Sequence, residues 1–345
     1  MKNVEYIIVG DGYAALFFAH QLMKHNQSFI IFSEGRKSAS QVSAGIINPV
    51  VLKKFTTFWK AQEQIDFLKT TLHEIQSYTG KNYLIDAAIH RIFHDENEQK
   101  LWLKKSDNEE LSAFLDKEFR HLGIVKNDFG TGKVDQSARL DVNNFFNDLF
   151  GYFENQSALV KEKFEYAKLN PSDSSYKNIT FKHIVFCEGM GVKENPYFSE
   201  IQVNANKGHH IKVKLSKGIP ANVTIKKKHF LFPLGNDLYF YGGTYDREQL
   251  HHHIDNSAVE QLVRGLSEFY PYDFEISDAS FGFRPTVKDR RPIIGRHAEH
   301  KNMYVFNGLG ARGILNGCYF SRSLYDFIEN SIPLHEEISI NRFNK

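Results

Sequence analysis

Six residues near the N-terminus, Gly10-Asp11-Gly12-Tyr13-Ala14-Ala15, have the types and spacing of a phosphate-binding turn. They fit the pattern G-x-G-x-x-G/A. Gly10 allows the tight turn, Gly12 lets the backbone approach a pyrophosphate, and the small Ala15 allows a helix to pack closely on a strand. The N-terminus of that helix offers free N–H groups and a positive partial charge to phosphates.

The elements around this turn agree with dinucleotide binding. Residues 4–9 form a β-branched run that predicts a buried strand, residues 14–25 predict a helix, and residues 29–32 predict a second strand. Glu34 follows that second strand, where it can accept hydrogen bonds from the adenosine ribose hydroxyls. Because a carboxylate there disfavours a 2′-phosphate, NADP is a poor candidate, and NAD and FAD remain.

The rest of the chain favours FAD over NAD. Residues 35–49 form a long loop rich in Ser, Ala and Gly, where an NAD dehydrogenase would continue with regular β/α units. A second glycine-rich turn, residues 308–313, lies near the C-terminus. The nucleotide-binding domain is therefore predicted to be assembled from distant segments.

Periodicity predicts further elements in both halves of the chain. Helices are expected over residues 58–78, 96–105, 109–121 and 256–269, after a cap at Asp141, and from 313 to about 330. Strands are expected within 82–94 and over 179–187, 208–215, 229–234, 237–243, 274–283 and 303–307. The predicted fold is α/β, with a Rossmann-like FAD-binding domain formed by residues 1–80, 140–207 and 282–345. Residues 81–139 and 208–281 form a smaller α+β substrate domain with an antiparallel sheet.

The C-terminal segment carries the most informative motifs. It contains Gly282-Phe283-Arg284-Pro285, then Asp289-Arg290-Arg291-Pro292-Ile293-Ile294-Gly295, and then a strand that leads into Gly308-Leu309-Gly310-Ala311-Arg312-Gly313. Together with the N-terminal turn, the loop and Gly242-Gly243-Thr244, these motifs resemble the D-amino-acid oxidase superfamily, and within it the glycine oxidases. The middle of the chain is diverged.

The resemblance implies a role for several residues. Arg284 matches the arginine that holds the substrate carboxylate, and a guanidinium fork suits that task because it offers two parallel donors. The residues implied to contact non-covalently bound FAD are Gly10, Gly12, Tyr13, Ala14, Ala15, Glu34, Ser43, Ala44, Gly45, Ile46, Asn48, Val160, Cys187, Gly189, Gly308, Leu309, Gly310, Ala311, Arg312, Gly313 and Ile314. The last helix is expected to direct its N-terminus at the flavin pyrimidine edge.

Three departures from the family pattern concern the substrate more than the cofactor. Leu309 stands where many family oxidases have histidine, and Glu188 is larger and more acidic than expected beside a cofactor. The segment Phe230-Leu231-Phe232-Pro233 lacks the expected active-site tyrosine, and Tyr239, Tyr241 and Tyr245 lie near it in the sequence.

The leading hypothesis is oxidation of the C–N bond of a small amine or amino acid, with hydride transfer to flavin N5 and oxygen as acceptor. Two alternatives stay open. One is an oxidase that acts on a modified tRNA wobble base, for which Lys212, Lys214 and Lys226–Lys228 would supply a basic face. The other is a flavin dehydrogenase, or an FAD-binding protein with degenerate chemistry.

Composition constrains partners and location. A formal net charge of +2 argues against nucleic acid as a partner. Two cysteines without metal-ligand spacing, and no recognisable signal peptide, favour the cytoplasm. No apolar run reaches the roughly 18 residues that span a membrane. The run His251-His252-His253 is interpreted as a solvated polar stretch, so no metal is expected, and the sequence leaves the oligomeric state open.

Overall fold

A mostly parallel sheet is built around the N-terminal strand β1 (Lys2–Val9). Tyr6, Ile7 and Ile8 are fully buried, as expected for a strand that is covered on both faces. The computed structural model, which describes residues 2–343, gives the order β11-β2-β1-β14-β13-β12, with β21 against β14 and β20 against β21. The bounds are β2 Phe29–Ser33, β11 Leu159–Lys161, β12 Leu169–Asn170, β13 Ser175–Tyr176, β14 Ile179–Phe186, β20 Ile293–Arg296 and β21 Met303–Asn307.

Five strands of this sheet end at the same edge. β1 is parallel to β2 and β14, β11 is parallel to β2, and β21 is parallel to β14. Ligands of open α/β sheets bind at the carboxyl ends of such strands. The segments that follow β1, β2, β14 and β21 hold most of the residues predicted to bind a dinucleotide.

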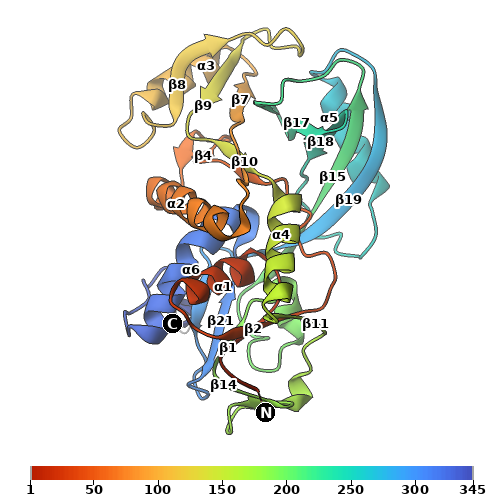
Figure 1. Cartoon of the computed structure of the whole chain (residues 1–345). Helices are drawn as coiled ribbons and strands as arrows, with labels where there is room; N and C mark the ends of the chain where they lie inside the picture. The colour runs from red at the N-terminus through yellow and green to blue at the C-terminus, as the bar shows by residue number, and fades with distance from the viewer. Residues whose placement is uncertain (1, 344–345) are drawn as a thin grey trace.

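Four helices pack beside or above this sheet (Figure 1). They are α1 (Tyr13–Lys24), α2 (Ala61–Thr79), α4 (Val142–Asn155) and α6 (Gly313–Glu329). α1 and α2 both pack on α6. Asp141 caps α4 as predicted, because its carboxylate accepts the N–H of Asn144 at 3.2 Å.

A second eight-stranded sheet lies above the first in Figure 1. Its order is β19-β15-β18-β17-β16-β7-β9-β8. Every neighbouring pair is antiparallel except β16 and β7, which are parallel. The bounds are β7 Ala88–Ile92, β8 Leu115–Arg120, β9 Thr131–Val134, β15 Asn204–Leu215, β16 Val223–Lys226, β17 Phe230–Gly235, β18 Leu238–Gly242 and β19 Phe274–Thr286.

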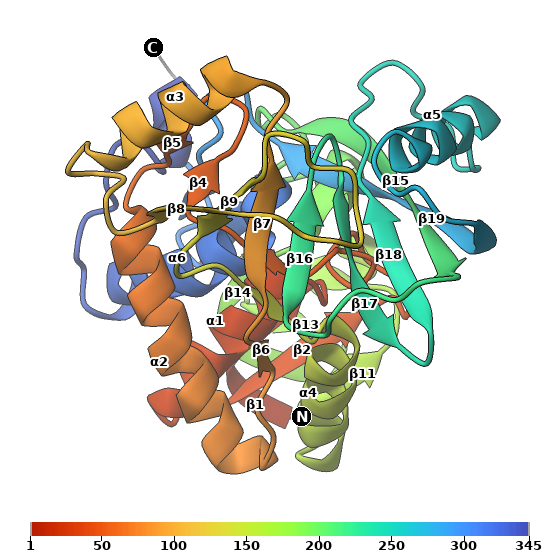
Figure 2. The same ribbon diagram turned by 90° about the horizontal axis from the view of Figure 1, so that it is seen from above.

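The two faces of this second sheet have different partners. Helix α5 (Asn256–Ser267) packs on one face, where Leu262 and Leu266 join a buried cluster with Ile211 and Tyr241 (Figure 2). The opposite face is directed at the first sheet, because a Cβ added to Gly282 would lie 2.7 Å from Val42 of the Ser/Gly-rich loop. We call this second face the site face.

Short elements complete the chain. The remaining helix α3 spans Glu96–Ser106. Two small sheets contain β3 (Ile46–Ile47), β6 (Leu84–Ile85) and β10 (Ala138–Leu140), and β4 (Val50–Val51) and β5 (Thr56–Thr57). Short 3₁₀ turns occupy Tyr166–Lys168, Gly189–Glu194, Gly310–Arg312 and Ile340–Phe343. Within residues 2–343, no helix is both long enough and apolar enough to cross a membrane.

One predicted element is wrong. Residues 109–121 were expected to be helical, but residues 115–120 form β8, which pairs with β9. The strands β15 and β19 also cross the proposed domain boundaries at 207/208 and 281/282. The division of the chain into those segments therefore stays a proposal.

Candidate functional site

The turn after β1 has the geometry that a phosphate needs. Gly10 has φ +113°, and a Cβ there would lie 2.4 Å from the carbonyl oxygen of Cys187 at the end of β14. Gly12 is the N-cap of α1 and provides no side-chain cap, and the first turn of the helix has no acidic residue. The hydroxyl of Ser40, from the Ser/Gly-rich loop, accepts the N–H of Tyr13 at 3.2 Å. The helix N-terminus is thus free of negative charge and covered only by a small polar side chain.

Tyr13 is the point where three distant segments meet. Its hydroxyl lies 2.8 Å from that of Ser43 in the loop. A Cβ added to Gly313 or Gly317 of α6 would lie 3.0 or 3.2 Å from Tyr13 atoms. The N-termini of α1 and α6 and the loop are therefore held together at one edge of the sheet.

The segment after β2 has a carboxylate available for ribose hydroxyls. Glu34 is 37% exposed and pairs with Arg36 at 3.2 Å and Lys163 at 3.6 Å. Val160 on the neighbouring strand β11 pairs with Phe32 of β2, which places it next to this position. Asp11, inside the turn, accepts the Ser33 hydroxyl at 2.6 Å, and burial raises its pKa. Its charge is thus turned from the helix N-terminus toward β2.

Glu188 is an unusual group at this edge. It follows Cys187 directly after β14, and burial raises its pKa to about 7. Tyr166 donates a short hydrogen bond to one carboxylate oxygen, and Asn195 donates to the other at 2.8 Å. At neutral pH the carboxyl is therefore partly protonated, which reduces the negative charge beside the nucleotide-binding edge.

The C-terminal turn is held open in a shape that favours glycine. Gly308 and Gly310 have φ +71° and +60°. The side chain of Asn307 accepts the N–H of Gly308 at 2.7 Å and donates to the carbonyl of Gly189 at 2.9 Å. Sequence reasoning missed Asn307, although its place before the glycines was a signal. The first turn of α6 has no acidic residue, so its N-terminus also suits an electron-rich group.

The remaining predicted cofactor residues fall into two groups. Ala15 and Ile314 are buried inside α1 and α6, where they pack against the core. Ala14, also buried in α1, and Ala311, exposed in the C-terminal turn, lie beside them. Gly45 has φ +68° and lies against the carbonyl of Leu140, while the Asn48 side chain accepts the Val50 N–H at 2.9 Å. These residues shape the loop next to Ile46 and Ala44.

Arg284 lies on the site face of β19. It shares this face with Gly282, two residues earlier, which faces Val42. Its Nη1 donates to the Asn206 side chain at 3.1 Å and to the Thr244 carbonyl at 3.0 Å. No carboxylate of residues 2–343 lies within 4.0 Å of it. Burial lowers the pKa of the guanidinium, and an arginine remains charged nevertheless.

Tyr245 is the tyrosine that reaches this group. The centre of its ring lies 4.5 Å from the Arg284 guanidinium carbon, and its side chain is 68% exposed. Tyr239 and Tyr241 instead lie in the cluster on the opposite face of the sheet. Arg312 packs over Phe58 at 4.4 Å, and its pKa, which burial lowers most, is also affected by Arg290 and Tyr245. Arg312 therefore lies near Tyr245.

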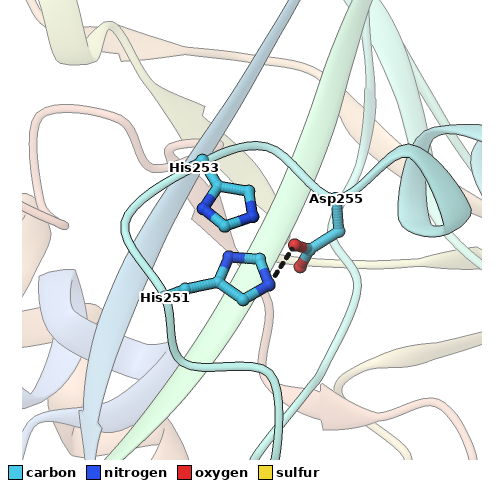
Figure 3. A group of neighbouring side chains, drawn as sticks. All are labelled: His251, His253 and Asp255. Carbon is cyan, nitrogen blue, oxygen red and sulfur yellow. Dashed lines mark ion pairs between the residues drawn. The ribbon is translucent and has the colours of Figure 1, made fainter.

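The histidine run is largely exposed, as expected, but His251 also takes part in a cluster of charged groups. His251, His253 and Asp255 bring potential metal-ligand atoms within 4.8 Å of one another (Figure 3). His252 instead faces Phe283. The His251 and His253 rings are stacked 3.4 Å apart at 9°, so their in-plane lone pairs do not converge on one ion. The ammonium of Lys207 lies 3.1 Å from both His251 Nδ1 and Asp255 Oδ2. In this cluster the Lys207 ammonium therefore provides the positive charge that a metal ion would otherwise provide.

The cradle at the sheet edge fits FAD. Two helix N-termini without acidic residues converge there, Gly10 cannot carry a side chain, and Asp11 is turned away toward Ser33. The site face of the second sheet, with Arg284, faces the loop that borders this cradle. The arrangement can hold a dinucleotide beside a cation that is free to bind an anionic substrate.

Comparison with protein families agrees with this geometry. A family model described as FAD dependent oxidoreductase matches residues 5–326. Among solved structures, the chain is similar to glycine oxidase from Geobacillus kaustophilus, with a TM-score of 0.79, 17% identity and coverage of 96% of this chain and 95% of that one. It is equally similar to iminodiacetate oxidase from Chelativorans sp., with a TM-score of 0.79, 15% identity and coverage of 97% and 99%. At these identities the likeness shows the fold.

A curated relative has a longer chain. The tRNA 5-methylaminomethyl-2-thiouridine biosynthesis bifunctional protein of Campylobacter jejuni is 23% identical over 98% of this chain. The match covers 57% of that protein, so the chain spans little more than half the length of this relative.

Proposed function

Because the chain belongs to the FAD-dependent oxidoreductase family and FAD is its cofactor, we propose that it oxidises the C–N bond of an amine or amino acid that carries a carboxylate. FAD, when bound, accepts two electrons and a proton as hydride from the carbon next to nitrogen. The chain's own residues would bind and orient the substrate. Oxygen as the final acceptor is part of this proposal.

The observation that carries the proposal is the unpaired Arg284. It lies half-buried on the site face, without a carboxylate among the described residues. Burying an unpaired cation costs free energy, and an anionic ligand would offset that cost. A carboxylate is the matching ligand for a guanidinium fork.

The neighbours of Arg284 support a positioning role. Asn206 and the Thr244 carbonyl both hold Nη1 and leave Nη2 without a described hydrogen-bond partner. A substrate carboxylate held there would have a fixed direction, so that its α-carbon is presented toward the cofactor-binding edge. Orientation of this kind can supply a large part of a catalytic rate.

The direct test is reduction of the FAD-loaded protein without oxygen. Glycine, sarcosine and a mixture of D-amino acids would be added separately, and the visible flavin absorbance would be followed. Bleaching by one of them, with hydrogen peroxide formed when air is admitted, is the expected result. A flavin that stays oxidised with all these amines, and with N-substituted glycines, would contradict the proposal.

A second candidate is oxidation of a modified base in tRNA, which the Campylobacter jejuni relative favours. Two lysines of the predicted basic face have partners within the chain. Lys212 pairs with Asp278 at 3.1 Å, and Lys226 lies over Phe230 and donates to the Lys228 carbonyl. tRNA binding that weakens steeply with salt would support this candidate, and no binding at low salt would remove it.

A further inference from the structure

Successive residues of the segment Asn206-Lys207-Gly208 of β15 lie on opposite faces of the sheet. Asn206 and Gly208 lie on the site face, because the Arg284 guanidinium bonds to Asn206 and a Cβ added to Gly208 would lie 2.3 Å from it. Lys207, between them, points to the opposite face, as alternation along a strand requires. Contacts that hold Lys207 in place on the opposite face therefore also hold Asn206 and Gly208 in place against Arg284.

Lys207 is fully buried and densely coordinated. Its ammonium donates to the His253 carbonyl at 2.6 Å and lies 3.1 Å from Asp255 Oδ2 and His251 Nδ1. It also lies 4.7 Å from the ring centre of Phe281. A buried ammonium is tolerated only with such partners, so this arrangement is specific and resists displacement.

Lys207 also holds the segment that covers Arg284. We call residues 243–255, between β18 and α5, the strap. Near its start, the backbone of Lys207 exchanges hydrogen bonds with Asp246 at 2.8 and 2.9 Å. Near its end, the ammonium binds His253 and Asp255. A single residue therefore ties both ends of the strap to β15.

The strap in turn contacts Arg284. The Thr244 carbonyl accepts from Nη1 and the Tyr245 ring covers the guanidinium. Thr244 is fixed to β15 as well, since its hydroxyl accepts the His209 N–H at 2.8 Å. The contacts that orient Arg284 thus come from β15 and the strap, and Lys207 joins these two.

We propose that Lys207 is a positioning residue for the substrate carboxylate: it fixes β15 and the strap so that the Arg284 guanidinium has one orientation. This role rests on the proposed function. Lys207 touches neither substrate nor cofactor and acts through Asn206, Gly208 and Thr244. Displacements of about 1 Å at such a site can weaken binding or catalysis by about a hundredfold.

The test is Lys207→Met, with Lys133→Met as the matched control. Lys133 lies on β9 of the same sheet in a partly exposed pair with Asp135 at 2.6 Å. Acetate would be titrated into the FAD-loaded proteins and its dissociation constant read from the flavin spectrum. Lys207→Met is expected to raise that constant about tenfold or more, and the KM of the reducing amine with it, while kcat changes less. Lys133→Met is expected to match the wild type, and so is the FAD affinity of both variants.

The outcomes separate the two proposals. An acetate constant within twofold of wild type in a folded, FAD-loaded Lys207→Met protein would overturn the role of Lys207. A wild type that binds no acetate and no other small carboxylate would overturn the proposed function, and this role with it. If Lys207→Met does not fold, His251→Ala, which removes one partly exposed ammonium contact, is expected to weaken acetate severalfold, and no change would overturn the role.

Discussion

Arg284 combines partial burial, positive charge and the lack of a carboxylate partner among residues 2–343, and this combination makes it the most informative single residue. Arg284→Leu is expected to weaken acetate binding roughly a hundredfold, because two charge-assisted hydrogen bonds are lost. The KM of an amino-acid substrate should rise in parallel. A spectral titration of the FAD-loaded protein measures the first effect and steady-state kinetics the second.

A surface arginine provides the control for this change. Arg264 on α5 is 71% exposed and pairs loosely with Glu260 at 3.7 Å. Arg264→Leu should leave both constants unchanged. Equal acetate affinities for Arg284→Leu and the wild type would remove Arg284 from the substrate site.

Glu188 gives a prediction about pH. Its pKa is raised from 4.5 to about 7 in the folded protein. Between these values the folded state keeps a proton that the unfolded state releases, so stability is full below pH 4.5 and falls as pH rises through 7. Glu188→Gln should remove that fall, which is about 3 kcal/mol in the free energy of unfolding. Denaturant unfolding from pH 4.5 to 8 measures it.

The control for Glu188 is an exposed glutamate nearby in sequence. Glu200 is exposed, and Glu200→Gln should keep the pH dependence of the wild type. If Glu188→Gln showed the same slope as the wild type, the carboxyl would not titrate with a raised pKa.

The functional residues that the sequence predicts are those that lie within sequence motifs. Arg284 and Gly10 were recognisable because their neighbours in sequence form a pattern. Asn206 and Lys207 were not, because their contacts with Arg284 and the strap arise from the register of β15 against β19 and β18. Thr244 belongs to a recognised motif, but its contact with Arg284 was not predicted. Register depends on which strands pair, and no local pattern records it.

Elements with strong periodicity were predictable, and one polar element was not. The helices α1, α2, α4 and α6 and the strands β1, β2 and β14 lie close to their expected positions. The segment Leu115-Asp116-Lys117-Glu118-Phe119-Arg120 has helix-forming residues but is a strand. It pairs with β9 and buries Leu115, so tertiary pairing overrides a weak local preference.

The turn before α1 allows a test of cofactor binding without loss of fold. A Cβ at Gly12 would approach only the Ser40 hydroxyl, at 2.9 Å, and that side chain can move. Gly12→Ala should therefore keep the free energy of unfolding of the FAD-free protein within about 1 kcal/mol. Its FAD dissociation constant should rise about tenfold or more, because the methyl group occupies the path of the phosphate. Flavin fluorescence titration measures this.

Gly151 in α4 is the matched position. Nothing lies within 4 Å of a Cβ added there. Gly151→Ala should stabilise the protein slightly, by up to about 1 kcal/mol, and leave FAD binding unchanged. Unchanged FAD affinity in Gly12→Ala would place the pyrophosphate elsewhere.

At the scale of the whole molecule, one buried cluster joins the two sheets, and each sheet also has a cluster of its own. The joining cluster contains Phe17 and Leu315 from the helices of the first sheet, Ile89 and Val134 from strands of the second, and Trp102 from α3. The sequence predicted two sheets and a discontinuous nucleotide domain. It did not predict this joining cluster, because the apolar faces of α3 and β9 do not indicate which surface they will meet.

Because this cluster joins them, FAD is expected to stabilise the first sheet with its helices and residues 81–139 together. Trp59 stacks on Phe320 of α6, whereas Trp102 is fully buried in α3. They are the only tryptophans in the chain, so Trp59→Phe and Trp102→Phe each leave one fluorescent reporter. FAD at a hundredfold excess over its dissociation constant should stabilise each variant by about 2.7 kcal/mol relative to the same variant without FAD. The contrary result would be a Trp102 unfolding midpoint that is the same with and without FAD. Residues 81–139 would then unfold independently of the FAD-binding region, despite the buried cluster that joins them.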